Sequence, residues 1–201
     1  RHRARRRVAM RRPQLDVRSP FLLLGEGSDE KVVFRKLLDS LGLDRVQVLD
    51  YGGRDECAGF LGALAVGSYT IERILVTRDA DESSEQAAQS LRDAISRAQF
   101  RESVLVEGFV IRGASGVGAL EDLFLDAIAA AEVSRMACVD QLFACAGIEK
   151  PIAKARLHAW LALQDEPWKR LREAIHSSPV LAVSAPSFGP LRERISSFFA
   201  T

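Results

Sequence analysis

The sequence predicts an α/β protein: a mostly parallel, four-stranded sheet flanked by helices, with a C-terminal helical extension. Three observations support this. Over residues 20–112, short apolar runs alternate with amphipathic stretches in the order β-α-β-α-β-α-β, which is typical of a parallel sheet covered on both faces. Beyond residue 112 the apolar residues recur at helical spacing, interrupted by prolines. The composition, 47% hydrophobic and 27% charged, is that of a globular domain with a real core.

Each element follows from a local pattern. Residues 21–25 are an unbroken apolar run, typical of a buried strand, and residues 28–42 carry an apolar stripe that Gly42 terminates. Ser83 or Ser84 can cap a later helix. The remaining strands are predicted over 45–49, 72–77 and 103–111, and the remaining helices over about 55–66, 83–98, 120–131, part of 133–146, 152–163, 168–176 and 191–200.

The positive charge is concentrated at the start of the sequence. The net charge is +1, yet residues 1–7 contain five arginines, so the rest of the chain is acidic. We expect residues 1–19 to be a basic, disordered arm, residues 20–112 the α/β core, and residues 113–201 a helical extension completing the same domain. Residues 1–9 precede Met10 and are interpreted either as non-native or as an arm that holds nucleic-acid phosphates non-specifically. Any other nucleic-acid contact needs a local basic patch, a metal bridge or a partner.

The sequence favours a cytoplasmic protein without a membrane anchor. It contains no apolar run of the 18 or more residues that suggest a membrane span and no apolar signal-peptide segment. Cys57, Cys138 and Cys145 form no CxxC pair. We expect them to be reduced and packed in the core.

Two acidic clusters each follow a predicted strand. Glu26 and Asp29 follow the first strand, and Asp79 and Asp81 follow the third. Because the carboxyl ends of parallel strands share one edge of the sheet, Glu26, Asp79 and Asp81 are expected to meet there. Two carboxylates about 4 Å apart repel by roughly 4 kcal/mol at an effective dielectric of about 20, so the cluster needs a divalent cation or shared protons. Oxygen ligands alone suit Mg²⁺ or Mn²⁺.

Simpler interpretations of these acids remain open. An isolated Asp-x-Asp is often a solvated turn, and a phosphoacceptor aspartate is less favoured because the second acid lies two residues after the first on the same loop. The alternative for Asp29 is a role limited to favourable interaction with the helix dipole. The segment Gly25-Glu26-Gly27 is not a dinucleotide fingerprint, because Glu30 stands where GxGxxG needs its third glycine.

Three further residues are candidates on weaker grounds. Glu121 and Asp122 follow a glycine-rich loop and open a predicted helix, where first-turn acids are also ordinary. Lys154 lies on a helix that could bring its ammonium group to a phosphate. The alternative for Lys154 is a solvated helix face.

In their order and strand context these residues resemble a Toprim domain, the Rossmann-like fold shared by topoisomerases, bacterial primases, ribosomal RNA maturases and OLD-family nucleases. The match is Glu26-Gly27 with Asp29, then Asp79-Ala80-Asp81. The later part is similar to small stand-alone Toprim-like proteins of unknown function. These carry Gly-x-Leu-Glu-Asp-Leu, here residues 118–123, and Lys-Ala-x-x-His-Ala-Trp-Leu-Ala, here residues 154–162.

The resemblance implies roles for these residues. Glu26 corresponds to the Toprim glutamate, assigned to acid–base catalysis or metal binding, and Asp79 and Asp81 to the metal-binding pair. In the two-metal nuclease branch, further acids complete a second site and a lysine assists catalysis. The candidates for these positions are Asp29, Glu121, Asp122 and Lys154.

The implied activity is Mg²⁺- or Mn²⁺-dependent hydrolysis or transfer of phosphodiesters in DNA or RNA. The chain departs from topoisomerases and primases because it lacks a tyrosine-bearing cleavage domain, a zinc module and an ATPase. Two alternatives stay open. One is a non-catalytic regulatory or interaction subunit working with a partner such as an ATPase, and the other is a phosphatase or nucleotidyl-transfer enzyme acting on small phosphates.

Overall fold

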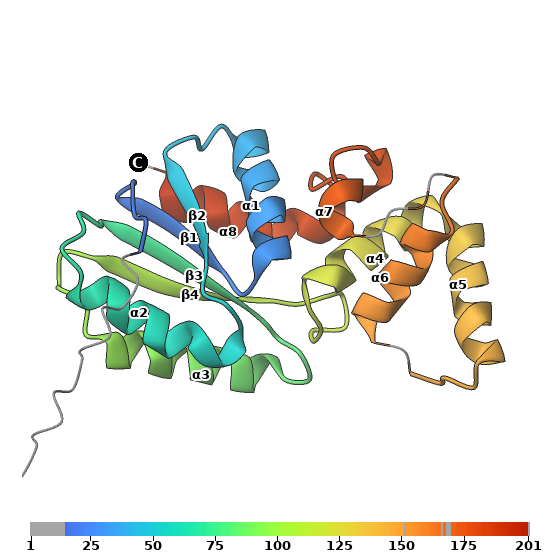
Figure 1. The fold of residues 1–201 in the computed structure, drawn as a ribbon, viewed down its shortest axis with the longest axis horizontal. Coiled ribbons are helices and arrows are strands. Elements are labelled where there is room, and N and C mark those ends of the chain that lie inside the picture. The colour runs from blue at the N-terminus through green and yellow to red at the C-terminus, as the bar shows by residue number, and fades with distance from the viewer. Residues whose placement is uncertain (1–14, 151, 166, 168–169, 201) are drawn as a thin grey trace, which may run out of the picture.

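The computed structural model describes residues 15–150, 152–165, 167 and 170–200, and its ribbon is shown in Figure 1. Within that part of the chain the α/β elements are β1 (Phe21–Gly25), α1 (Ser28–Leu41), β2 (Val46–Asp50), α2 (Cys57–Val66), β3 (Arg73–Asp79), α3 (Ser84–Ala98) and β4 (Leu105–Ile111). The later helices are α4 (Leu120–Ala131), α5 (Val133–Cys145), α6 (Ala153–Ala162), α7 (Leu171–Ala174) and α8 (Gly189–Phe199). Short 3₁₀ turns cover Arg54–Glu56, Pro179–Leu181 and Pro186–Phe188.

The four strands form one sheet in the order β2-β1-β3-β4, and every pairing is parallel. In the central register, Leu23 of β1 lies between Val48 of β2 and Leu75 of β3. The predicted fold class is therefore confirmed. Every strand and helix predicted over residues 20–112 is present, with bounds within two residues of those expected.

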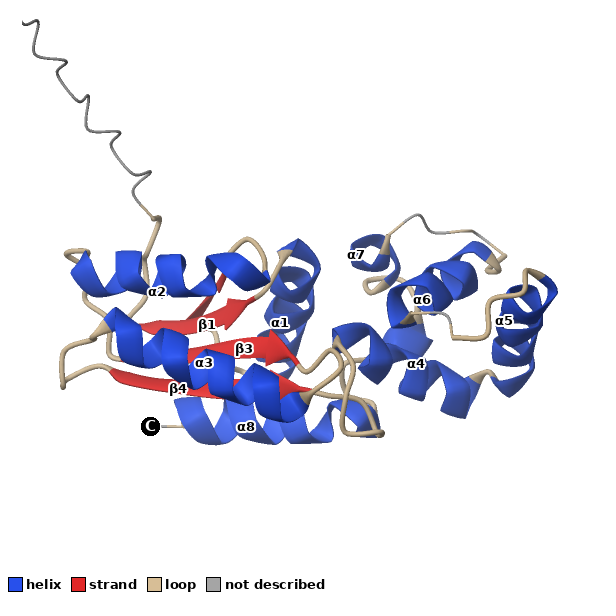
Figure 2. Ribbon diagram, turned by 90° about the horizontal axis from the view of Figure 1, so that it is seen from below, coloured by secondary structure: helices blue, strands red, loops and turns tan. Residues whose placement is uncertain are grey.

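Side-chain alternation along the strands divides the core between two faces of the sheet. Leu22 and Leu24 of β1 belong to an apolar cluster with α2 and α3, whereas Leu23 belongs to a larger cluster with α1 and α8. This is the two-residue period expected of a strand buried on both sides. Figure 2 shows α2 and α3 on one side of the sheet and α8 on the other.

The predicted helical extension occupies two places. Helices α4 to α7 lie beyond the arrowheads of the strands, as Figures 1 and 2 show, whereas α8 returns to pack under the sheet. Both parts share one continuous core with the sheet, which includes Phe124, Trp160 and Phe199. The extension therefore completes the same apolar core, and α4 to α7 form a wall facing the carboxyl ends of the strands.

The start of the described chain is held by specific contacts. Although an arm was predicted over 1–19, residues 15–19 run beside β2, where the Gln47 side chain accepts hydrogen bonds from the backbone N–H groups of Arg18 and Ser19. The arginine-rich segment and Met10 lie outside the described residues.

The structure also bears on two further expectations, which concern the cysteines and membrane-spanning helices. Core packing was expected of all three cysteines, but only Cys57 is buried and Cys138 and Cys145 are exposed, because they lie on the outer face of α5. Across the described residues, every helix is too short or too polar to cross a membrane.

Candidate functional site

The candidate site lies where the chain reverses its direction across the sheet. From β1 the chain moves outward to β2, then crosses back to form β3 on the other side of β1. This makes the carboxyl ends of β1 and β3 a topological switch point, where open parallel sheets usually bind ligands. Glu26 follows β1 directly, and Asp79 is the last residue of β3.

Close approach of α1 to β1 fixes the direction in which Glu26 leaves the strand. A Cβ at Gly25 would lie 2.8 Å from the Cβ of Glu30 and 3.0 Å from the ring of Phe34. Glycine at position 25 therefore lets the first turn of α1 pack directly on the strand end. The following backbone is held from the other side by Gly53, whose N–H donates to the Glu26 carbonyl oxygen at 2.9 Å.

Helices α1 and α4 begin at this edge with the same arrangement of acids. In each helix the third residue turns back to cap the N-terminus. The Glu30 Oε2 accepts from the N–H of Gly27 at 3.0 Å, and the Asp122 Oδ2 accepts from the N–H of Ala119 at 2.7 Å. These carboxylates satisfy backbone donors that have no partner within the helix. The structure thus uses Asp122, a predicted metal ligand, as a helix cap.

The second residues of three helices face a common hollow. They are Asp29 in α1, Glu121 in α4 and Lys154 in α6, and all three line the space beside Glu26 and Asp79. Second-position acids suit the positive end of a helix, whereas a lysine there opposes the helix dipole. Placement of Lys154 in that first turn therefore favours an interaction with an anion or with the acids of the site.

Asp79 is the carboxylate of the site whose pKa is shifted most by its surroundings. Its Oδ1 accepts a hydrogen bond from the Leu120 N–H at 3.0 Å, which links the end of β3 to the start of α4. Burial raises the pKa of Asp79 to about 8, and the negative charges of Glu30, Glu121 and Glu26 add to the shift. These side chains are therefore close enough for the charge of one to change the pKa of another.

Glu26 has an unsatisfied buried oxygen. Its Oε2 has no hydrogen-bond partner among the described residues. Burial, followed by the charge of Asp81, raises the pKa of the Glu26 carboxyl, while Arg78, Arg54 and the backbone N–H of Asp79 act in the opposite direction. An orphaned carboxylate oxygen is costly unless something binds it.

Asp81 diverges from Asp79. Its backbone has a φ of 49°, and its N–H and carbonyl groups pair with those of Gly118 at 2.8 Å in an isolated antiparallel bridge. Its carboxylate forms an ion pair with Arg54, with Oδ2 3.1 Å from Nη1. The turn after β3 therefore directs Asp81 toward the rim of the site and Asp79 into it.

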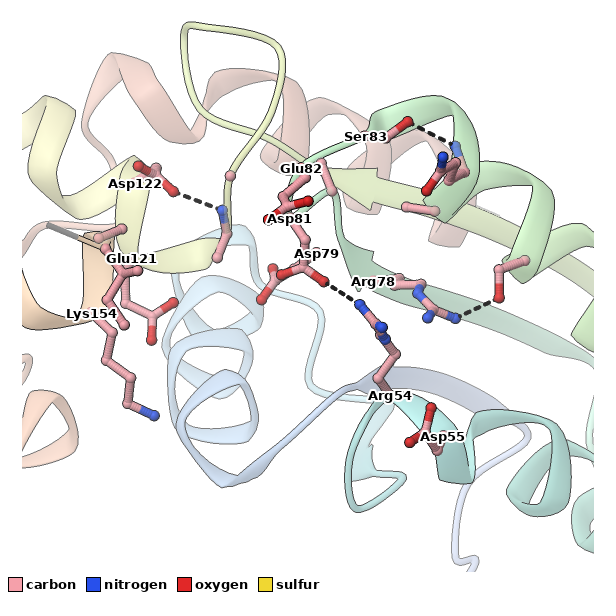
Figure 3. A pocket seen from close by; sticks show the side chains of 18 residues that line it. Arg54, Asp55, Arg78, Asp79, Asp81, Glu82, Ser83, Glu121, Asp122 and Lys154 are labelled. Atoms are coloured by element: carbon pink, nitrogen blue, oxygen red, sulfur yellow. Dashed lines mark hydrogen bonds and ion pairs between the residues drawn. The ribbon is translucent and has the colours of Figure 1, made fainter. Parts of the chain in front are cut away.

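Figure 3 shows the hollow that contains these groups, with Glu121 and Lys154 on one side, Arg54 and Arg78 on the other, and Asp79 and Asp81 between them. It measures about 1090 Å³ and continues into the space beside Glu26 through Asp79, Glu121 and Lys154, which line both. A space of this size holds ligands larger than a metal ion.

The structure brings most of the predicted site residues to one place. Glu26, Asp79, Glu121 and Lys154 surround the hollow, with Asp29 beside them. Among the described residues, however, no three Asp, Glu, His or Cys side chains are already arranged to hold an ion. A cation would have to draw the carboxylates together. The chemistry of the group fits Mg²⁺ or Mn²⁺, because every available donor is an oxygen and Glu26 Oε2 has no other partner.

Sequence reasoning missed three residues of the site. Glu30, considered only as a break in a glycine motif, has a pKa raised first by burial and then by Glu121 and Glu26. Its place at the third position of the predicted helix, where a capping acid is expected, was the available signal. Arg54 and Arg78 also line the hollow. Arg78 immediately precedes Asp79 on β3, and strand alternation alone places the two side chains on opposite faces.

Comparisons with known proteins identify a family. A family model described as "Protein of unknown function (DUF3226)" matches residues 20–200. No curated protein and no solved structure matches the chain. The matched residues include the whole sheet, the three helices whose first turns face the hollow, and α8. The chain therefore belongs to the DUF3226 family.

Proposed function

We propose that this protein is a Toprim-like enzyme that hydrolyses or transfers phosphodiesters in nucleic acid with the help of Mg²⁺ or Mn²⁺. One observation carries the proposal: several mutually repelling carboxylates meet at the switch point of a parallel sheet, and one of their buried oxygens has no hydrogen-bond partner within the described part of the chain. Such an arrangement costs free energy in the absence of a counter-charge. A divalent cation supplies that counter-charge.

Each residue has a distinct part in this proposal. Asp79, Glu26 and Glu121 are the principal cation ligands, and Asp81 and Asp29 reach the ion from the rim. A bound Mg²⁺ or Mn²⁺ activates water and stabilises the oxygen that leaves phosphorus. Asp122 supports the site as a cap that holds the first turn of α4 in place.

Glu26 and Lys154 are the proposed catalytic groups. Burial raises the pKa of Glu26, which favours a carboxyl that can take up a proton during the reaction. Lys154 has an ammonium group at the mouth of the hollow, where it can stabilise the negative charge that develops on a phosphate. Its charge also offsets the acidic lining, which would otherwise repel a polyanionic substrate.

The direct test is cleavage of nucleic acid in Mn²⁺ and in Mg²⁺. Wild-type protein is incubated with plasmid, single-stranded DNA and RNA alongside Asp79→Asn, Glu26→Gln and the control Asp39→Asn, which alters an exposed carboxylate at the far end of α1. We expect cleavage by the wild type and by the control, and a loss of at least about 100-fold in the two site variants.

Cation binding is tested separately from cleavage. Mn²⁺ should raise the melting temperature of the wild type and of Asp39→Asn, but not that of Asp79→Asn, since a ligand stabilises only the fold that binds it. Cleavage that persists in Asp79→Asn would refute the metal-site assignment. Cation binding without cleavage of any substrate would favour the regulatory-subunit alternative.

A further inference from the structure

Arg78 is a buried positive charge near the end of β3. Arg78 is only 9% exposed, and its guanidinium donates a hydrogen bond to the Ser90 hydroxyl at 2.9 Å. Among the described residues, no carboxylate lies within ion-pair distance of it. Buried charges in proteins are normally paired. Arg78 also lines the hollow, where its guanidinium can meet an anion.

A groove with a basic lining continues from Arg78 between the start of α2 and α3. Because side chains alternate on β3, Arg78 faces α2 and α3, whereas Asp79 faces α1 and α4. The charged side chains lining this groove are three arginines and two aspartates: Arg54, Arg78, Arg97, Asp55 and Asp93. Gln86 and Ser90 add neutral groups that can donate hydrogen bonds. The groove therefore has a small excess of positive charge in a protein body that is otherwise acidic.

Arg54 connects the groove to the acidic site. It lines both spaces, and it is held by a single ion pair to Asp81 in which the two side chains are 57% and 48% exposed. Pairs that are this exposed contribute little stability, so another anion can compete for the guanidinium. If Asp81 turns toward a cation, as the proposed function requires, its ion pair with Arg54 breaks. The Arg54 guanidinium then becomes available to another anion.

We propose that Arg54 and Arg78 bind the phosphates of a single nucleic-acid strand whose adjacent phosphodiester lies at the Glu26–Asp79 site. The strand would then run from the acidic site into the groove between α2 and α3. This inference rests on the proposed function for its choice of substrate. The chemistry it requires is recognition of a phosphate oxyanion by guanidinium groups, which bind such oxygens in pairs.

The test measures binding rather than cleavage. Fluorescently labelled oligothymidylate is titrated with protein in Ca²⁺, whose looser coordination makes it a poor substitute for Mg²⁺, and anisotropy is followed at several salt concentrations. The variants are Arg54→Gln and Arg78→Gln. The control is Arg101→Gln, which alters an exposed arginine in the loop before β4, at the opposite edge of the sheet.

We expect each groove variant to bind about tenfold more weakly, with a salt dependence shallower by about 0.7 for each lost phosphate contact. The control should bind like the wild type. A merely structural role for Arg78 would weaken binding without changing the salt slope. Substitution of the buried Arg78 can prevent folding, so Arg54→Gln, at an exposed position, provides an independent test, and melting curves show which variants are folded.

The outcomes separate this inference from the proposed function. Wild-type binding and salt slope in folded Arg54→Gln and Arg78→Gln would overturn the inference, even if the protein cleaves nucleic acid. Weakened binding with a reduced salt slope would support it even if no cleavage is found. Competition by thymidine monophosphate as effective as that by the oligonucleotide would overturn the strand assignment in favour of a mononucleotide site.

Discussion

Asp79 shows how one residue can link the fold to its function. It is the last residue of β3, it accepts the first N–H of α4, and its carboxylate lies among other acids. Burial raises its pKa to about 8, so the ionised form is disfavoured in the folded protein and not in the unfolded chain. Its titration is therefore coupled to folding.

The stability of the protein should depend on pH through Asp79. Below about pH 4 the residue is protonated in both states, and its contribution to stability is fully present. As the pH rises through about 8, the folded state must hold a disfavoured charge and this contribution is lost. The loss is at most about 6 kcal/mol, at about 1.4 kcal/mol per pKa unit.

Asp79→Asn should remove this dependence, since the amide oxygen still accepts from Leu120 N–H but carries no charge. In urea unfolding with EDTA, the variant should match the wild type near pH 4 and exceed its free energy of unfolding by a few kcal/mol at pH 8.5. Parallel curves for the two proteins across this pH range would contradict the argument. Millimolar Mg²⁺ should narrow the difference by stabilising only the wild type.

At the residue scale, the sequence was informative where local rules decide the position. Glu26 and Asp79 were placed correctly because a strand end fixes where the next side chain lies. Asp81 was expected beside Asp79, but the left-handed turn at Asp81 directs it toward Arg54. No local pattern predicts that turn, because it depends on pairing with Gly118, 37 positions further along the chain.

At the scale of elements, two neighbouring acids in the first turn of α1, and likewise of α4, have different roles. The third residue caps the helix and the second faces the hollow. The sequence shows both acids in each pair, Asp29-Glu30 and Glu121-Asp122, but not which of the two the cap will use. That choice depends on the geometry of the preceding backbone.

Asp122 offers a test of this division. Asp122→Ala should lower the free energy of unfolding by about 1 kcal/mol through loss of the cap, and Asp122→Asn, which retains an acceptor, by less. Both should bind Mn²⁺ like the wild type, whereas Glu121→Gln should bind it more weakly without being destabilised, because it relieves repulsion with Asp79 and Glu30. Calorimetric titration and urea unfolding measure the two quantities. Weakened Mn²⁺ binding by Asp122→Asn, comparable to that of Glu121→Gln, would restore Asp122 as a ligand.

Gly118 is a constrained position in the loop before α4. Gly118 has a φ of +103°, and a Cβ there would lie 2.2 Å from Asp122 Oδ2. Other residues at this position therefore incur both backbone strain and a collision with the cap. This explains physically why a glycine precedes the Leu-Glu-Asp-Leu segment, whose two leucines are buried.

At the scale of the whole molecule, α8 is the element whose place was hardest to foresee. Its amphipathic pattern predicted a helix, but many apolar faces could receive it. In the structure it closes the α1 face of the sheet, where the Phe199 ring lies 6.5 Å from that of Phe21. Such long-range docking depends on the shape of the surface left by the other elements, which no window of sequence contains.

Phe199 should therefore matter to the stability of the sheet as a whole. Phe199→Ala removes a ring that is 95% buried and should cost about 3–5 kcal/mol, a large fraction of a typical domain's stability. The comparison is Val66→Ala, at a position 82% exposed, which should change the free energy of unfolding by less than about 0.5 kcal/mol. An equally small effect of Phe199→Ala would mean that α8 is not required to close the core.

The position of α8 also sets an order of events during synthesis. The four strands are complete at Ile111, but the helix that covers one of their faces begins only at Gly189. A nascent chain must therefore carry an apolar sheet surface, open to water and to other chains, while some 80 further residues are added. The protein is most vulnerable to aggregation in this interval, and a chaperone that shields the α1 face of the sheet should increase its yield.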